Sequence, residues 1–160
     1  MKNSYYYRTA IGLIGISENE TGITDVFFMN QPDPLLLQKE SPLIKRTISQ
    51  LREYLNGTRQ VFDLPLAPQG TPFQQSVWKE LLKIPYGSTR SYQDVAKAIG
   101  KPQACRAVGM ANNRNPLVII IPCHRVIGAG GKLVGYGGGL AIKAKLLELE
   151  KTKQALHSES

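Results

Sequence analysis

The side chains best suited to covalent chemistry lie together in residues 121–125, where Cys123 is followed by His124. A thiolate is a strong nucleophile, and an imidazole can accept the proton that the thiol must lose. These residues follow 117–121, a continuous apolar run typical of a fully buried strand. The sequence therefore predicts Cys123 at the end of a buried strand, a rigid place for a nucleophile.

The residues alone leave a second interpretation of Cys123 open. A lone cysteine is more often a small buried hydrophobic residue, and a lone histidine is more often a hydrogen-bonding partner than a catalyst. Adjacent side chains of a strand also point to opposite faces, so the neighbouring positions of Cys123 and His124 are not diagnostic.

The other cysteine and histidine exclude some classes of site. Cys105 and His157 complete a set of two cysteines and two histidines in 160 residues. Two cysteines cannot form a disulfide framework in a chain of this length, and the set lacks the spacing of a structural zinc site. We expect free thiols, no metal and no cofactor.

Two glycine-bearing loops and a helix follow the thiol. The loops are residues 126–131 and 135–139, and the helix spans 141–150, ends at Glu150, and has Ile142, Leu146 and Leu149 inward. Such loops let backbone groups contact a flat ligand. A phosphate-binding loop is the alternative, but neither loop has the Gly-Lys-Ser/Thr ending that would support it.

The bulk composition predicts a globular, basic, cytoplasmic protein. The chain is 42% hydrophobic, and 20 basic against 12 acidic residues give a net charge of +8. No apolar run reaches the length needed to cross a membrane, and the first residues do not resemble a signal peptide. The charge fits either a polyanionic partner or a merely basic surface.

The first part of the chain predicts a small antiparallel sheet and a helix. Residues 5–7, 11–16 and 23–28 are rich in β-branched and aromatic residues, with a turn at 19–22. Ser41 suits the N-cap of a helix that stops at Gly57. The buried stripe of this helix is expected to comprise Ile44, Ile48, Leu51 and Leu55.

The second part predicts short helices. Thr71 to Gln74 form a capping box before an apolar face made of Phe73, Val77, Trp78, Leu81 and Leu82. Ser91 caps a helix over 92–99, and another helix is expected over 103–113. Two short helices joined by a tight turn indicate a helix-turn-helix, although an ordinary helical hairpin has the same spacing.

The helix over 103–113 has small residues and one arginine, Arg106, on a neutral surface. A helix that reads the major groove offers several Arg, Asn or Gln side chains to the bases. This one instead suits a narrow groove, or else close packing against another helix. The small residues are Ala104, Ala107, Gly109 and Ala111.

Residues 121–126 resemble the active-site signature of the O6-alkylguanine-DNA alkyltransferases. The similarity continues through residues 91–93, 109–116, 136–140 and Glu150, and covers about residues 62–150. The resemblance implies an α+β fold, with a ribonuclease H-like sheet-and-helix domain followed by a mostly helical domain with a winged-helix-like helix-turn-helix. The expected boundaries are a first domain at 1–62, a linker at 63–70, a second domain at 71–153 and a tail at 154–160.

The same resemblance implies direct reversal of DNA damage. The alkyl group of O6-alkylguanine, and of O4-alkylthymine, would pass irreversibly to Cys123, once per molecule. His124 would take the thiol proton through a water, Glu150 would orient the imidazole, and Tyr92 would donate a proton to the departing base. Asn115 would tie the recognition helix to the active-site segment.

The implied partner is double-stranded DNA, entered from the minor groove by a monomeric protein of the cytoplasm, associated with the nucleoid in a bacterium. The target base would be rotated out of the duplex, with Arg106 in its place. The base would be held by Val126, Tyr136 and Gly137. The residues implied to contact DNA are Gln93, Gln103, Ala104, Arg106, Ala107 and Gly109.

Departures from the family pattern concern the pocket. Gly137 stands where relatives commonly have serine or alanine, so a hydroxyl contact to the base is lost. Asn112 and Asn113 stand where relatives vary. Two other classes remain as alternatives: a module that binds the lesion without reacting, against which Cys123 argues, and a Cys-His hydrolase, for which no Asn or Asp is placed by motif and no peptide-binding groove is evident.

Overall fold

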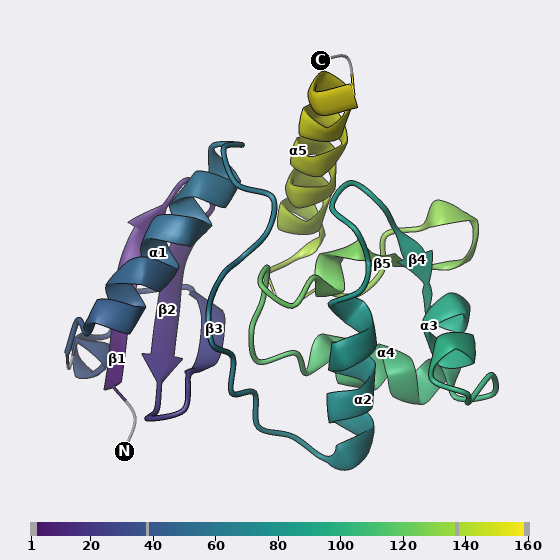
Figure 1. The fold of residues 1–160 in the computed structure, drawn as a ribbon, viewed down its shortest axis with the longest axis horizontal. Coiled ribbons are helices and arrows are strands. Elements are labelled where there is room, and N and C mark those ends of the chain that lie inside the picture. Colours follow the sequence, from purple (N-terminus) through teal and green to yellow (C-terminus); the bar gives the residue numbers. More distant parts are fainter. Residues whose placement is uncertain (1–2, 38, 137, 159–160) are drawn as a thin grey trace. The chain divides into compact units, whose positions relative to one another are not determined.

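The computed structural model describes residues 3–37, 39–136 and 138–158 (Figure 1). The chain divides into two compact units, residues 1–69 and 70–160. The first unit holds the antiparallel sheet, and the second holds most of the helices and the candidate site. None of the helices in these described residues is long and apolar enough to cross a membrane.

The sheet of the first unit has the strand order β1-β2-β3. Its strands are β1 (Asn3–Thr9), β2 (Gly12–Glu18) and β3 (Ile23–Met29), as the β-branched and aromatic runs predict. β2 is central and buried along most of its length. The ring of Phe27 lies so close to Gly15 that a Cβ there would come within 2.3 Å of it, so a larger residue at this position of β2 would require the ring to move.

The helix α1 (Pro42–Leu55) packs against β1 and β2. Ser41 caps it, since its Oγ accepts a hydrogen bond from the backbone N–H of Ile44 at 3.2 Å. The predicted stripe is confirmed except at its end, where Tyr54 is fully buried and Leu55 is only half-buried. A short 3₁₀ helix, η1 (Pro34–Leu36), precedes α1.

Residues 63–70, expected as a linker, follow the edge of β3 for part of their length. Ile23 pairs with Leu66 in a parallel bridge, and its backbone bonds to Pro65 and Ala67 at 2.9 and 2.8 Å. The side-chain amide of Gln50 on α1 both donates to and accepts from the backbone of Asp63. These hydrogen bonds fix the last residues of the first unit to β3 and α1, although those residues form no regular secondary structure.

In the second unit, α2 (Pro72–Leu81), α3 (Tyr92–Ala98) and α4 (Cys105–Asn113) pack against one another. Both predicted caps are confirmed: Thr71 with Gln74, and Ser91 with Asp94, form reciprocal capping boxes. The helix expected from residue 103 begins two residues later. The prediction for Leu82 was wrong, because it lies beyond the last turn of α2 and is 48% exposed.

Two short strands, β4 (Arg90–Ser91) and β5 (Val126–Ile127), pair in parallel immediately before α3 and after the reactive segment. Arg90 pairs with Val126, and Ser91 with Ile127. This pairing joins the start of α3 to the segment that carries Cys123, although 35 residues separate Arg90 from Arg125 in sequence. The 3₁₀ helices η2 (Cys123–Arg125) and η3 (Ala129–Gly131) flank β5.

The last helix, α5 (Leu140–Ser158), contacts η2. It is longer than the helix expected over 141–150, and residues 154–158 of the expected tail continue it. Leu146 is buried as predicted, while Ile142 and Leu149 are only half-buried. The inward positions near them are occupied instead by two charged residues, Lys143 and Glu150.

Candidate active site

The strand predicted over residues 117–121 is not formed, and a series of tight turns takes its place. The N–H of Ile120 donates to the carbonyl of Val118 at 2.8 Å, and Ile119 between them has a φ of 71°. A β-branched residue is strained at positive φ. The buried side chain of Ile119, which is 1% exposed, helps to hold this conformation. Cys123 is therefore positioned by a strained turn.

Asn115 bonds to both ends of this turn. Its Nδ2 donates to the carbonyl of Ile121 at 2.8 Å, and its Oδ1 accepts from the N–H of Leu117 at 2.9 Å. A side chain thus supplies hydrogen bonds that a neighbouring strand would otherwise have provided. Because Asn115 follows α4 directly, it links the end of that helix to the segment before Cys123.

Cys123 begins η2 and is 4% exposed. Its N–H donates to the carbonyl of Ile121 at 2.7 Å across Pro122, which has a φ of −79° and a ψ of 63°. The following residue, His124, lies in the same 3₁₀ turn rather than on a strand. The objection that adjacent strand side chains point apart therefore does not apply to this pair.

His124 and Arg125 converge on the carboxylate of Glu150. The imidazole Nε2 of His124 lies 2.6 Å from Glu150 Oε2. Arg125 donates from Nε to Oε1 at 2.8 Å and from Nη2 to Oε2 at 3.0 Å, a bidentate ion pair. The N–H of Gly87 donates to Oε1 at 3.2 Å. At 0%, 7% and 1% exposure, His124, Arg125 and Glu150 form a buried cluster.

The charges of this cluster can be assigned from its contacts. Against the effect of burial, hydrogen bonds from His124 and Arg125 and the positive charge of Arg125 lower the pKa of Glu150 to about 2. Burial lowers the pKa of His124, because the arginine already neutralises the carboxylate and an additional buried positive charge is disfavoured. A neutral His124 bonded to a carboxylate must carry its proton on Nε2, which leaves Nδ1 as the basic nitrogen.

The thiol of Cys123 is protonated in the resting protein. Burial raises its pKa to about 11, and hydrogen bonds from Asn115 and from its own backbone, together with the charge of Lys143, oppose the rise. At pH 7 such a thiol is ionised in roughly one molecule in ten thousand. The site therefore needs a base to make the nucleophile.

Lys143 was missed by the sequence analysis. Its side chain is fully buried, and its ammonium donates to the carbonyls of Val126 at 2.7 Å, Val134 at 2.8 Å and Gly135 at 3.4 Å. Burial lowers the pKa of Lys143, and the charge of Cys123 raises it. The signal was present in the sequence, since Lys143 and Glu150 are seven residues apart and share the inward stripe of α5 with Leu146.

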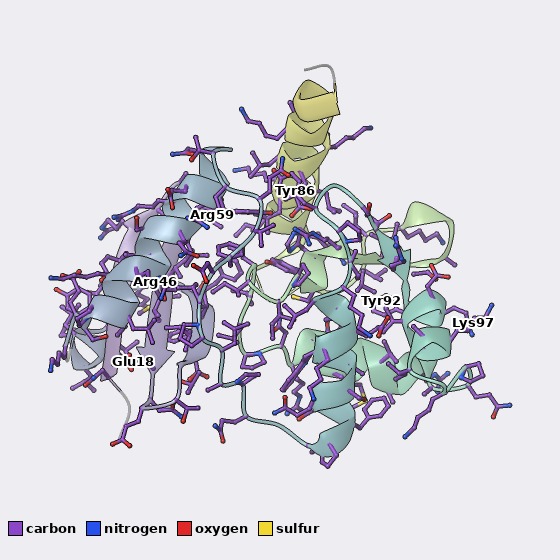
Figure 2. All side chains as sticks on the ribbon, in the orientation of Figure 1. Glu18, Arg46, Arg59, Tyr86, Tyr92 and Lys97 are labelled. Atoms are coloured by element: carbon purple, nitrogen blue, oxygen red, sulfur yellow. The ribbon has the colours of Figure 1, made fainter. Side chains whose placement is uncertain are left out.

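The two tyrosines expected at the site lie within electrostatic reach of Cys123. Tyr92 extends from the first turn of α3 (Figure 2), and its hydroxyl donates to the carbonyl of Val134 at 3.1 Å. Burial and the charge of Cys123 raise the pKa of both Tyr92 and Tyr136, and Tyr136 also lies edge-on to the ring of His124. Gly137, expected to hold the base, lies outside the described residues.

Except for Gln93, the residues expected to contact DNA lie on α4 and in the turn before it. Gln103, Arg106 and Ala107 are exposed, while Ala104 and Gly109 are half-buried. Gln93 lies on α3, and its side chain forms hydrogen bonds within the protein. Its amide donates to the carbonyl of Pro102 at 2.9 Å and accepts from the thiol of Cys105 at 2.8 Å. The side chain of Gln93 therefore links α3 to the turn before α4.

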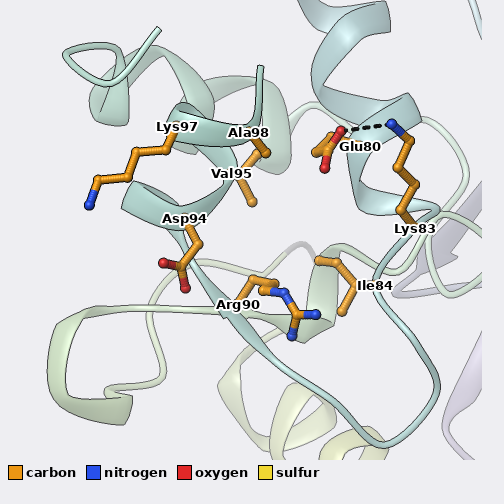
Figure 3. A pocket seen from close by; sticks show the side chains of 8 residues that line it. All are labelled: Glu80, Lys83, Ile84, Arg90, Asp94, Val95, Lys97 and Ala98. Atoms are coloured by element: carbon orange, nitrogen blue, oxygen red, sulfur yellow. Dashed lines mark ion pairs between the residues drawn. The ribbon is translucent and has the colours of Figure 1, made fainter. Parts of the chain in front are cut away.

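A hollow of about 470 Å³ lies away from the thiol, between the end of α2 and α3 (Figure 3). It has charged residues of both signs, including an ion pair of 3.2 Å between Lys83 and Glu80. No cysteine or histidine lines it. Among the described residues, no group of three or more His, Cys, Asp and Glu side chains could hold a metal ion.

Comparison with known proteins identifies the family. Residues 3–68 match the family described as 6-O-methylguanine DNA methyltransferase, ribonuclease-like domain, and residues 72–152 match its DNA binding domain. The chain belongs to the O6-methylguanine DNA methyltransferase family. The resemblance stated from residues 121–126 is confirmed, as is the predicted α+β fold.

Relatives match along nearly the whole chain. The methylated-DNA–protein-cysteine methyltransferase of Methanosarcina barkeri is 50% identical over 145 residues, covering 88% of this chain and 92% of the relative. The constitutive enzyme of that name from Bacillus subtilis is 48% identical, with 91% and 95% covered. The crystal structure of Mycobacterium tuberculosis OGT in complex with DNA matches with a TM-score of 0.86 and 45% identity, covering 94% and 93%.

Proposed function

We propose that this protein repairs DNA directly, as a methylated-DNA–protein-cysteine methyltransferase that moves the alkyl group of O6-alkylguanine onto Cys123. The observation that carries the proposal is the buried cluster of His124, Arg125 and Glu150 next to a buried thiol. Its relatives bear the name of this activity. The same chemistry would serve O4-alkylthymine, whose alkyl group is also bonded to an exocyclic oxygen of the base.

The reaction begins with loss of the thiol proton. In this mechanism His124 Nδ1 accepts that proton through a water, and the resulting imidazolium is stabilised by Glu150. Arg125 keeps Glu150 ionised and fixed, which supports this role. The thiolate is stabilised by the amide of Asn115, by its own backbone N–H and by the positive charge of Lys143.

The displacement follows in one step. The Cys123 sulfur attacks the carbon bonded to O6, an S–C bond forms, and the C–O bond breaks with its electron pair remaining on the guanine. Tyr92 donates a proton to the base as this negative charge develops. In the resting protein the Tyr92 hydroxyl donates to Val134, so it exchanges that partner for the base. The thioether is stable, which limits each molecule to one reaction.

The pocket for the base would be formed by Val126, Tyr136, Gly137 and the backbone of Cys123. Lys143 supports this pocket from behind, because its ammonium holds the carbonyls of Val126, Val134 and Gly135 in place. The carbonyl of Val126 can accept a second hydrogen bond, from the guanine amino group. We assign Lys143 as a positioning residue for this wall.

The DNA would be bound by the helix-turn-helix, with α4 in the minor groove. The exposed face of α4 offers Arg106 and the small Ala107, and Gly109 beside them is half-buried. A Cβ at Gly109 would make only an ordinary 3.8 Å contact with Tyr92, so packing within the protein does not require glycine there. Small residues on this face let the groove approach the helix. Arg106 would occupy the place of the extruded base, with Gln93, Gln103 and Ala104 near the backbone.

We also propose that the protein acts as a monomer in the cytoplasm, and near the nucleoid in a bacterium. The division into domains at 1–62 and 71–153 assigns the reactive and DNA-binding residues to the second domain. The extrusion of the base costs a few kcal/mol, and a lesion lowers this cost because it pairs poorly.

Intact-protein mass spectrometry tests the proposal. After incubation with a duplex that contains O6-methylguanine, we expect a mass increase of one methyl group, located on Cys123 by peptide mapping. Cys123→Ala should abolish the increase. Cys105→Ala should retain it, because Cys105 lies on the helix-turn-helix and is not the proposed acceptor of the methyl group. Methyl transfer that persists in Cys123→Ala would refute the proposal, and lesion binding without any mass change would favour the non-reacting module.

A further inference from the structure

The side chain of Asn112 is buried on the last turn of α4, beside the reactive segment. It is 2% exposed, and its Nδ2 donates to the backbone carbonyl of Cys123 at 3.4 Å. The oxygen of the same amide, Oδ1, is also buried, and no hydrogen-bond donor within the described residues reaches it. The mechanism proposed above does not use this oxygen.

A buried amide oxygen without a donor is uncommon in folded proteins and calls for an explanation. The two polar atoms of one amide are about 2.3 Å apart, which places Oδ1 within about 6 Å of the Cys123 carbonyl oxygen. The oxygen thus lies close to the backbone of the residue that receives the alkyl group.

The other polar side chains near the sulfur are donors or are already engaged. Tyr92 donates to Val134, Lys143 donates to three carbonyls, and the oxygen of Asn115 accepts from Leu117. The carbonyl of Cys123 accepts from Asn112 itself. Asn112 Oδ1 is a buried acceptor near this site that no donor among the described residues reaches, and unlike His124 Nδ1 it has no part in the proposed mechanism.

We propose that Asn112 determines specificity for the transferred group, favouring O6-alkyl groups that carry a hydrogen-bond donor over hydrocarbon groups of the same size. The inference rests on the proposed alkyl transfer to Cys123. A 2-hydroxyethyl adduct is the simplest example: its hydroxyl donates to Asn112 Oδ1 while the sulfur attacks the carbon bonded to O6. The C–O bond breaks, guanine leaves with the electron pair, and the hydroxyl keeps its proton.

The matched comparison is O6-(2-hydroxyethyl)guanine against O6-n-propylguanine in the same duplex, because the two groups have the same number of non-hydrogen atoms. Second-order rate constants would be measured for the full chain by intact mass at quenched time points. The ratio of the two constants is divided by the ratio for a simple thiolate reacting with the two nucleosides in solution, which removes the difference in intrinsic reactivity. We expect a corrected preference of about tenfold for the hydroxyethyl group, the effect of one hydrogen bond.

The variants isolate the amide. Asn112→Leu keeps the size and shape of the side chain and removes its oxygen, so we expect the corrected preference to fall to about one, with transfer of the propyl group retained. Asn30→Leu, at an exposed position in the first unit, should keep the preference. A corrected ratio near one in the unmodified protein would overturn the inference, even if Asn112→Leu does not fold.

The remaining outcomes are also decisive. An equal preference in the unmodified protein and in a folded Asn112→Leu would overturn the role of Asn112, as expected if a buried water serves Oδ1. Absence of transfer from both adducts and from O6-methylguanine would instead refute the proposed function. Transfer of the methyl group with no preference between the larger groups would refute only the inference about specificity.

Discussion

At the scale of single residues, the site combines a protonated thiol with a neutral imidazole. Burial raises the pKa of Cys123 to about 11 and lowers that of His124, so neither group is charged at neutral pH. Glu150 and Arg125 carry the opposite charges that fix the ring. Proton transfer from sulfur to imidazole can therefore be coupled to arrival of the substrate, and the thiolate need not persist in its absence.

The pH dependence of the reaction follows from these directions. His124 must be neutral to accept the proton, and its lowered pKa keeps it neutral to below the ordinary value of 6.5. We expect the rate of Cys123 alkylation by a free O6-alkylguanine base to be level near pH 7 and to fall on acidification with a midpoint below 6.5. Stopped reactions analysed by mass at a series of pH values provide the measurement.

Two histidine variants test this pH profile, His124→Gln as the test and His157→Gln as its control. His124→Gln should remove the acid limb and make the rate climb about tenfold per pH unit toward pH 11, because only hydroxide then ionises the thiol. His157→Gln should behave like the unmodified protein. A midpoint above 6.5, or an unchanged profile in His124→Gln, would contradict the assignment of His124 as the base.

At the scale of elements, the position of the thiol depends on turns tied by one side chain. Asn115 satisfies two buried backbone groups, the N–H of Leu117 and the carbonyl of Ile121. We expect Asn115→Ala to lower the free energy of unfolding by about 2–6 kcal/mol, since each of the two orphaned buried groups costs about 1–3 kcal/mol. Urea denaturation gives the value, and Asn113→Ala is the comparison, expected to change stability by less than about 0.5 kcal/mol. Similar losses in the two variants would mean that Asn115 does not hold the turn.

The elements that were predicted correctly are those with local signals. The capping boxes at Thr71 and Ser91 and the strands at 3–29 depend on neighbours a few residues apart, and both are confirmed. The apolar run at 117–121 was misassigned because hydrophobicity reports burial, whether the backbone is a strand or a turn. Its turns depend on the side chain of Asn115 and on the positive φ of Ile119, which no periodicity encodes.

Some residues of the candidate site could likewise be predicted from the sequence, and others could not. Cys123, His124 and Glu150 could be named from a motif and a resemblance, and the structure brings the last two into contact. Lys143 and Arg125 were given no part, because a charged residue in sequence is normally taken as solvent-exposed. The place of Lys143 on the inward stripe of α5 could have indicated its burial, whereas the burial of Arg125 becomes apparent only when α5 is placed against η2.

At the scale of the whole molecule, the net charge of +8 fits a phosphate-bearing partner. We expect affinity for duplex DNA to fall linearly with salt on a double-logarithmic plot, with a slope of about −0.9 for each phosphate neutralised. Fluorescence anisotropy over a range of salt concentrations measures the slope. The rate of reaction with the free base should change little over the same range. A duplex affinity that is independent of salt would indicate that the basic surface serves another purpose.

The burial of the Cys123 thiol matters because each molecule of this protein can react only once. Cys123 is 4% exposed and protonated, whereas Cys105 is half-buried on the helix-turn-helix. Peroxides, soluble electrophiles and small disulfides react with thiols that are both accessible and ionised. The thiol of Cys123 is neither, so these reagents should react with it slowly. Burial thus protects the one reactive thiol of each molecule from side reactions until a damaged base enters the site.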